Sequence, residues 1–90
     1  MGGIAMGELE KLPNIGAFVE GQLNEVGITT YEQLKEVGSK QAWLKIKVID
    51  DSACINRLYA LEGAIQGIKK TLLSTELKVE LKEFYNAFKG

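Results

Sequence analysis

Histidine is absent from this 90-residue sequence, and cysteine and proline occur once each. Without histidine the chain cannot assemble a Ser-His-Asp triad, a Cys-His pair or an ordinary zinc site. Paired carboxylates such as Asp50 and Asp51 also have no neighbouring histidine or cysteine that would complete a metal or acid–base site. We therefore expect a protein that is not an enzyme and that holds no metal and no cofactor.

The single cysteine, Cys54, cannot form a disulfide within the chain. It lies between Ala53 and Ile55, in a short apolar run at the start of a predicted helix. Because a free cysteine usually behaves as a small hydrophobic residue, we predict that Cys54 is buried.

An excess of one charge and long hydrophobic runs are missing as well. The 11 basic and 12 acidic residues give a net charge of -1, which provides no general attraction to a phosphate backbone or an anionic membrane. No apolar run approaches the roughly 20 residues that span a bilayer, and no basic region followed by an apolar segment marks a secretory signal. We expect a soluble, cytoplasmic protein that does not contact a membrane.

The length and composition fit one globular domain. Ninety residues are too few for two separate cores, and 46% hydrophobic with 26% charged residues is typical of folded proteins. The glycine-rich residues 1–6 predict a flexible N-terminal segment, so the domain is expected over residues 7–90. Its first element is predicted as a short helix over residues 7–12, ended by Pro13.

Apolar residues then recur at helical spacing along the chain. The first such stripe predicts a helix that ends at Gly27, where a left-handed cap fits. Its members are Ile15, Phe18, Val19, Leu23 and Val26. Thr30 and Gln33 have the spacing of a capping box, which predicts a second helix that ends at Gly38.

The next segment has two competing patterns. Ser39 is in position to cap a helix, whereas residues 44–48 alternate between apolar and charged as a strand does. The shared face of that helix is Trp43, Ile46 and Ile49. We favour a helix for the first half, because a lone strand has no partner in this chain for its backbone groups. Residues 50–52 are expected to form a loop or cap.

The longest helix is predicted over residues 53–69, followed by a final helix that Ser74 caps. The apolar face of the longest helix comprises Ile55, Leu58, Leu61, Ile65, Ile68 and Leu72. Its small residues indicate close approach by a neighbouring helix or, alternatively, a groove for a partner; they are Ala60, Gly63, Ala64 and Gly67. About five helices without a sheet predict an all-α, single-domain bundle.

One continuous core is expected to join these helices. Its predicted members are Ile15, Phe18, Leu23, Leu58, Leu61, Ile65, Leu77, Leu81 and Phe84. The final turns of the last helix crowd three aromatic residues together, Phe84, Tyr85 and Phe88. Since an exposed aromatic cluster marks an interface, these three are candidate interface residues for a homodimer. The alternative is that they cap the open end of the core.

Two segments near the start of the chain resemble a helix-hairpin-helix. They are Leu12-Pro13-Asn14-Ile15-Gly16 and, after the intervening helix, Val26-Gly27-Ile28-Thr29-Thr30. In that motif the turn exposes backbone N–H groups at a helix N-terminus, where a phosphate oxygen can bind. The candidate nucleic-acid contacts are therefore Asn14 and Gly16 in the turn and the small basic group of Lys40, Lys45 and Lys47.

Further motifs extend the resemblance to a known family. With the Tyr59-Ala60-Leu61-Glu62-Gly63-Ala64 segment and the Glu76-Leu77-Lys78 start of the last helix, the chain resembles the C-terminal domain of the TfoX family over roughly Leu9 to Leu81. The resemblance implies a helix-hairpin-helix-like module of a bacterial family linked to the regulation of natural competence. In that family the domain often follows a separate N-terminal domain, for which 90 residues leave no room. We therefore expect a stand-alone module.

Two hypotheses about function follow. The leading one is a small regulatory interaction module that acts through protein partners, and another copy of itself is one candidate partner. The alternative is direct binding of nucleic acid, independent of base sequence, through the hairpin and the lysines. It is not favoured, because Ala17 and Phe18 stand where a phosphate-binding hairpin commonly has a lysine. Asn14 replaces the usual first glycine of the turn, but asparagine tolerates left-handed backbone geometry.

Overall fold

The structure is a computed structural model that describes residues 8–88, so the flexible segment predicted for residues 1–6 lies outside the described residues. Its elements are η1 (Leu9–Lys11), α1 (Ala17–Glu25), α2 (Tyr31–Val37), α3 (Ser39–Ile49), α4 (Ile55–Gln66), η2 (Lys70–Leu72) and α5 (Thr75–Phe88), where η denotes a short 3-10 helix. Residues 8–88 contain no strand. The prediction of an all-α domain of about five helices is therefore confirmed. Within the same residues no helix has both the length and the apolar character needed to cross a bilayer.

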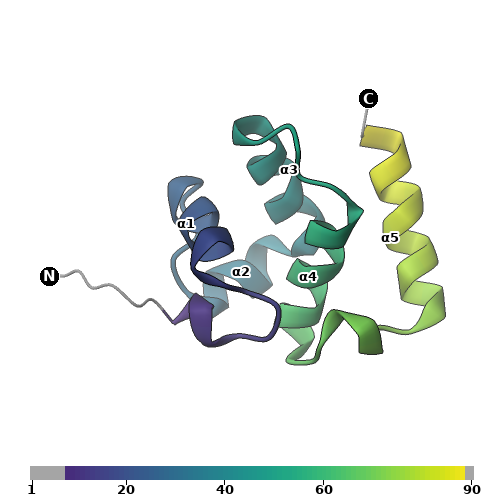
Figure 1. Cartoon of the computed structure of the whole chain (residues 1–90), viewed down its shortest axis with the longest axis horizontal. Coiled ribbons are helices and arrows are strands. Elements are labelled where there is room, and N and C mark those ends of the chain that lie inside the picture. Colours follow the sequence, from purple (N-terminus) through teal and green to yellow (C-terminus); the bar gives the residue numbers. More distant parts are fainter. Residues whose placement is uncertain (1–7, 89–90) are drawn as a thin grey trace, which may run out of the picture.

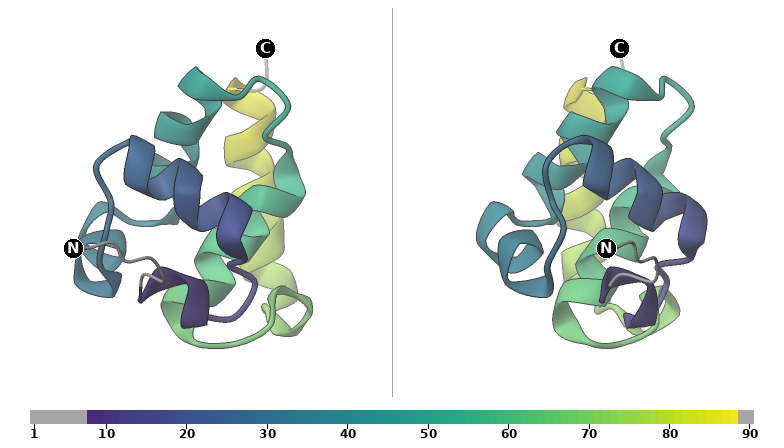
Figure 2. Two further views of the ribbon diagram at one scale, coloured as in Figure 1. Left: turned by 60° about the vertical axis from the view of Figure 1, so that its left-hand side comes forward. Right: turned by 90° about the vertical axis from the view of Figure 1, so that its left-hand side faces the viewer.

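α4 lies at the centre of the molecule. It contacts α2, α3, η2 and α5, while α1 packs against η1 and α3. In Figure 1, α1 and α2 lie on one side of α4 and α5 lies on the other. Figure 2 shows the same arrangement from two further sides. Elements from both halves of the chain therefore share α4 as a packing partner.

The core is built around Trp43 of α3. This side chain is fully buried, and its indole Nε1 donates a hydrogen bond to the carbonyl oxygen of Cys54 at 3.2 Å. The other large, fully buried side chains are Leu9, Leu23, Ile28, Leu34, Ile46, Leu58, Leu61 and Leu81. Eight of the nine predicted core residues belong to this cluster or pack against it. One continuous core is thus confirmed, with the exception of Phe18.

Phe18 is 67% exposed, so its predicted place in the core is wrong. The prediction counted helical spacing from Ile15, but α1 begins only at Ala17. Gly16, between them, has an extended backbone with φ -98° and ψ -175°. The rest of the predicted stripe does face the core: Ile15 and Leu23 are buried, and Val19 and Val26 pack against the core.

The start of α2 contains a modified capping box. Thr30 Oγ1 accepts a hydrogen bond from the backbone N–H of Gln33 at 3.1 Å, as the sequence predicts. Gln33 Oε1 accepts in return from the N–H of Thr29 at 2.7 Å, one residue earlier than in the usual motif. The helix ends, also as predicted, at Gly38, whose φ of 86° lies in the region that favours glycine.

Two predictions about helix starts are wrong. Ser39 is the first residue of α3 and does not cap it; its hydroxyl donates to Oε1 of Glu62 at 2.6 Å. Cys54 is exposed and directly precedes α4, where the backbone is extended with φ -106° and ψ -174°. Because successive side chains of an extended backbone point to opposite sides, Ala53 takes the buried position and Cys54 faces out.

Two helix boundaries also differ from those predicted. The helix predicted over 53–69 ends at Gln66, because Gly67 adopts the left-handed conformation with φ 78° and caps it. Leu72, predicted on the apolar face of this helix, lies in η2 and is exposed. The ambiguous residues 44–48 are helical and α3 continues to Ile49, whose side chain is about half exposed in the last turn.

Candidate interaction surfaces

The predicted hairpin turn contains Asn14 in the left-handed conformation, with φ 70°. Its side chain is directed into the molecule. Nδ2 donates to the carbonyl oxygens of Ile68 at 3.0 Å and Ala60 at 3.4 Å, and Oδ1 accepts from the N–H of Lys70 at 3.0 Å. Asn14 therefore joins the turn before α1 to α4 and η2. The other predicted turn contact, Gly16, is exposed at the N-terminus of α1.

Gly63 makes room for the Asn14 side chain. A Cβ atom on Gly63 would lie 2.5 Å from Nδ2 of Asn14 and 2.8 Å from the carbonyl oxygen of Ile68. These distances are shorter than packed atoms allow. The glycines of the longest helix are thus explained by Asn14 and by the cap at Gly67, instead of by a crossing helix. No local pattern in the sequence connects Asn14 with Gly63.

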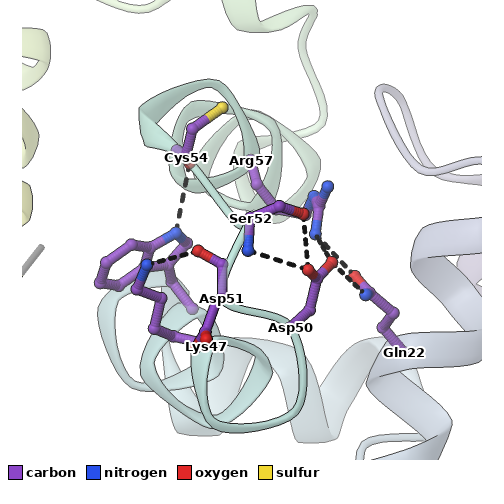
Figure 3. A network of polar contacts seen from close by, with 8 residues as sticks. Gln22, Lys47, Asp50, Asp51, Ser52, Cys54 and Arg57 are labelled. Carbon is purple, nitrogen blue, oxygen red and sulfur yellow. Dashed lines mark hydrogen bonds and ion pairs between the residues drawn. The ribbon is translucent and has the colours of Figure 1, made fainter.

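A polar cluster connects α1, the α3–α4 loop and α4 (Figure 3). Asp50 Oδ2 accepts from Nε2 of Gln22 at 2.7 Å and from Nη1 of Arg57 at 3.0 Å, and this Nη1 also donates to Oε1 of Gln22 at 2.9 Å. Asp50 Oδ1 accepts from the backbone N–H of Ser52 at 3.0 Å and from its hydroxyl at 2.5 Å. The sequence predicted the loop but gave no indication that Gln22 and Arg57 meet there.

The contacts of this cluster suit it to stabilising the fold and not to catalysis. The hydroxyl of Ser52, the amide of Gln22 and the guanidinium of Arg57 hold the pKa of Asp50 well below its ordinary value. Asp50 therefore stays ionised near neutral pH and is unsuited to general acid–base chemistry. Among residues 8–88, no group of three or more His, Cys, Asp and Glu side chains is placed to hold a metal ion.

The three predicted lysines of α3 differ in their contacts. Lys40 Nζ forms an ion pair with Oε2 of Glu80 on α5 at 2.6 Å. Lys47 Nζ donates to the carbonyl oxygen of Asp51 at 2.6 Å. Lys45 is exposed and forms no ion pair within the described part of the chain. Two of the three lysines are therefore engaged in contacts with the protein itself.

Other cations lie close to the hairpin. Arg57 and Lys70 line a small hollow that Asn14, Val19 and Asn56 also border, and no carboxylate lines it. The guanidinium of Arg57 is shared with Asp50, as described above. Arg57 and Lys70, and none of the three lysines of α3, therefore border this hollow.

The three aromatic residues at the end of α5 do not share one environment. Phe84 and Tyr85 make edge-to-face contacts with Trp43, with ring centroids 6.2 Å and 5.5 Å apart. Phe88 packs on Phe84 with a centroid distance of 4.7 Å but remains 51% exposed. Phe84 and Tyr85 therefore cover the core, whereas Phe88 is available at the surface. Their role as a dimer interface stays a prediction.

Comparisons with known proteins identify a matching family and a similar curated protein. The family described as the TfoX C-terminal domain matches residues 5–85. Protein Sxy of Escherichia coli (strain K12) is 36% identical over 76 residues, which cover 84% of this chain and 36% of Sxy. The chain thus spans little more than a third of the length of this curated relative.

Two solved crystal structures are similar to this chain in both sequence and fold. The crystal structure of an uncharacterized protein from Listeria monocytogenes, in a triclinic form, has a TM-score of 0.89 and 49% sequence identity and covers 91% of this chain and 93% of that chain. A tetragonal crystal form of a Listeria monocytogenes protein of unknown function has a TM-score of 0.86 and 49% identity, over 89% of this chain and 98% of that chain. The described fold is therefore similar over nearly its whole length to that of these bacterial proteins.

Proposed function

Because the chain belongs to the TfoX C-terminal domain family, we propose that it is a small, non-enzymatic regulatory module that acts through protein partners. The family match over residues 5–85 and the similarity to Protein Sxy support a module of the competence-regulator type. Since the chain covers only 36% of Sxy, the proposal concerns the part of the regulator that this domain represents.

The observation that carries the proposal is the chemistry of the hairpin surface. A phosphate-binding hairpin needs free donors and positive charge. Here Ala17 and Phe18 at the start of α1 contribute no positive charge, and both side-chain amide hydrogens of Asn14 are used within the molecule. The first turn of α1 presents the aromatic ring of Phe18, which is 67% exposed. Aromatic side chains of this kind are enriched in interfaces between proteins.

The proposal is tested in the source bacterium by following transcripts and cross-linked proteins together. Deleting the gene should change the levels of specific transcripts, and re-expressing the tagged chain should restore those levels. Specific proteins should be cross-linked to the tagged chain and purified with it. Three charge insertions at exposed apolar positions, Phe18→Asp, Val48→Asp and Phe88→Asp, sample different surfaces. At least one should lose both a cross-linked protein and the transcript change. Lys45→Glu, at an exposed polar position, is the control that should lose neither.

Two outcomes would contradict the proposal. One is an unchanged transcript profile after deletion. The other is that all three apolar variants behave as the wild type while Lys45→Glu abolishes regulation. Circular dichroism of each purified variant confirms that a loss does not come from unfolding.

Nucleic-acid binding is the second candidate, and the hollow lined by Arg57 and Lys70 favours it. Because phosphate contacts weaken steeply as salt rises, fluorescence anisotropy with a generic labelled duplex at low and moderate salt tests it. The leading proposal expects no binding at micromolar protein even at low salt. Salt-sensitive binding that Lys70→Glu or the pair Lys45→Glu and Lys47→Glu abolishes would instead establish the alternative.

A further inference from the structure

The outer face of α1 is a single exposed stripe. Its residues recur at positions 0, 1, 4, 7 and 8 from the start of the helix, which is one side of a 3.6-residue turn. They are Ala17, Phe18, Gly21, Asn24 and Glu25. The buried residues Glu20 and Gln22 flank the stripe, and the buried Leu23 lies on the opposite side. No described residue of the chain packs over the middle of this stripe, where Gly21 lies open.

The stripe combines a protruding ring with a depression. Phe18 is 67% exposed, and one side of its ring faces the guanidinium of Arg57, 5.6 Å from the ring centroid. A shallow hollow adjoins it, lined by Ala17, Phe18, Gly21, Gln22 and Glu25. The Phe18 ring protrudes from α1 and the hollow lies beside it on the same helix. A second copy of this face can therefore fit against the first, ring into hollow.

Gly21 has no packing role inside the chain. A Cβ atom added there would meet no heavy atom within 4 Å, whereas at Gly63 it would lie 2.5 Å from Asn14 Nδ2. Glycine in the middle of a helix is less favourable than alanine. A glycine in this position therefore has a structural purpose if another helix approaches α1 closely from outside.

The stripe is symmetric about Gly21. If a second copy of α1 runs antiparallel and crosses at Gly21, residues 17 and 18 of one copy lie at the level of residues 24 and 25 of the other copy. Phe18 of each copy then enters the hollow of the other, beside Gln22 and Glu25. The same surface patch is used twice, as in the isologous interfaces of two-fold dimers.

Charges at the two ends of the stripe are complementary in this arrangement. Arg57 lies next to Phe18 at one end, and Glu25 lies at the other. Glu25 forms no ion pair with any described residue. Arg57 uses Nη1 for Asp50 and Gln22, which leaves the hydrogens on Nε and Nη2 for a further acceptor. The antiparallel crossing brings Arg57 of each copy towards Glu25 of the other.

We propose that the protein forms a two-fold homodimer in which antiparallel α1 helices cross at Gly21 and each Phe18 fills the hollow of the other copy. This inference goes beyond the proposed function, because its partner is the chain itself and it holds whether or not the protein regulates transcription. It also places the dimer contact on α1, away from the aromatic residues of α5.

Sedimentation equilibrium from micromolar to submillimolar concentration tests the dimer. Wild type should show a monomer–dimer equilibrium. Gly21→Gln, which has open space around it in the monomer, should fold and raise the dissociation constant by at least about tenfold. Phe18→Ser should do the same without adding bulk to α1, so it serves if Gly21→Gln fails to fold. Glu25→Lys should weaken the dimer most at low salt, because it places like charges together.

Two control variants make the result specific. Glu36→Lys makes the same charge change at an exposed position of α2 and should leave the dimer intact. Phe88→Asp should also leave it intact, since α5 is not part of the proposed contact. The inference is overturned if wild type is monomeric over the whole range. It is equally overturned if Phe88→Asp dissociates the dimer while the folded α1 variants do not.

Discussion

At the scale of single residues, Asp50 is held by contacts from three segments of the chain. The hydroxyl of Ser52, the amide of Gln22 and the guanidinium of Arg57 all bond to its carboxylate. These contacts lower the pKa of Asp50 in the folded state below the value of about 3.9 that is typical of an unfolded chain. The ionised form is therefore the one that folding favours. Its contribution to stability is present above about pH 4 and is lost as the pH falls below that value.

Asp50→Asn should therefore lower the midpoint of thermal unfolding at pH 7, because the amide cannot replace the charge. The difference from wild type should shrink as the pH is lowered from about 5 to about 2, where wild-type Asp50 loses its advantage. Circular dichroism melts at a series of pH values measure this. Asp51→Asn is the matched control, since no hydrogen bond of its side chain is found among the described residues. A difference that does not depend on pH would show that the charge of Asp50 is unimportant.

Two glycines should respond in opposite ways to the same substitution. Gly63→Ala should cost about 1 to 3 kcal/mol of unfolding free energy, because its Cβ collides with Asn14 and breaks the contacts that join the hairpin to α4. Gly21→Ala should stabilise the monomer by up to about 1 kcal/mol, because alanine is the better helix former and the space is open. Urea unfolding in dilute solution compares them. Equal effects would mean that Asn14 does not constrain position 63.

At the scale of elements, α5 is anchored to α3 through aromatic side chains. Phe84 and Tyr85 contact Trp43, whereas Phe88 lies at the surface. Phe84→Ala should therefore cost about 1 to 3 kcal/mol, less than for a fully buried phenylalanine. Phe88→Ala should cost less than about 1 kcal/mol. Trp43 is the only tryptophan of the sequence, so its fluorescence reports this contact directly. Equal losses for the two variants would refute the division between core and surface.

At the scale of the whole molecule, α4 connects most of the other elements into one core. It contacts α2, α3, η2 and α5, and its Leu61 is fully buried. Leu61→Ala should cost about 2 to 5 kcal/mol. One core should unfold as one unit. Far-ultraviolet circular dichroism and Trp43 fluorescence should therefore agree on a single transition midpoint for the wild type, and should again agree on a single, lower midpoint for the variant. Separate midpoints would show that α5 unfolds independently of the rest.

Much of the fold could be predicted because helical periodicity is a local property. The spacing of Leu58 and Leu61, the capping pair of Thr30 and Gln33, and the tolerance of Asn14 for left-handed geometry each depend on residues a few positions apart. The errors arose where the exact residue at which a helix begins decides which side chains face the core. α1 begins two residues after Ile15, which turned Phe18 to the surface, and the extended backbone before α4 exposed Cys54.

By itself the sequence determined the helical architecture, the continuous core, the family and the absence of histidine chemistry, because composition and short-range spacing decide these. Only the tertiary structure decided which polar groups meet. Asn14 reaches Ile68 and Lys70, and Gln22 and Arg57 share Asp50, through contacts between segments far apart in the chain. Such pairs leave no periodic signal, since their geometry depends on how the helices pack and not on the spacing within any one of them.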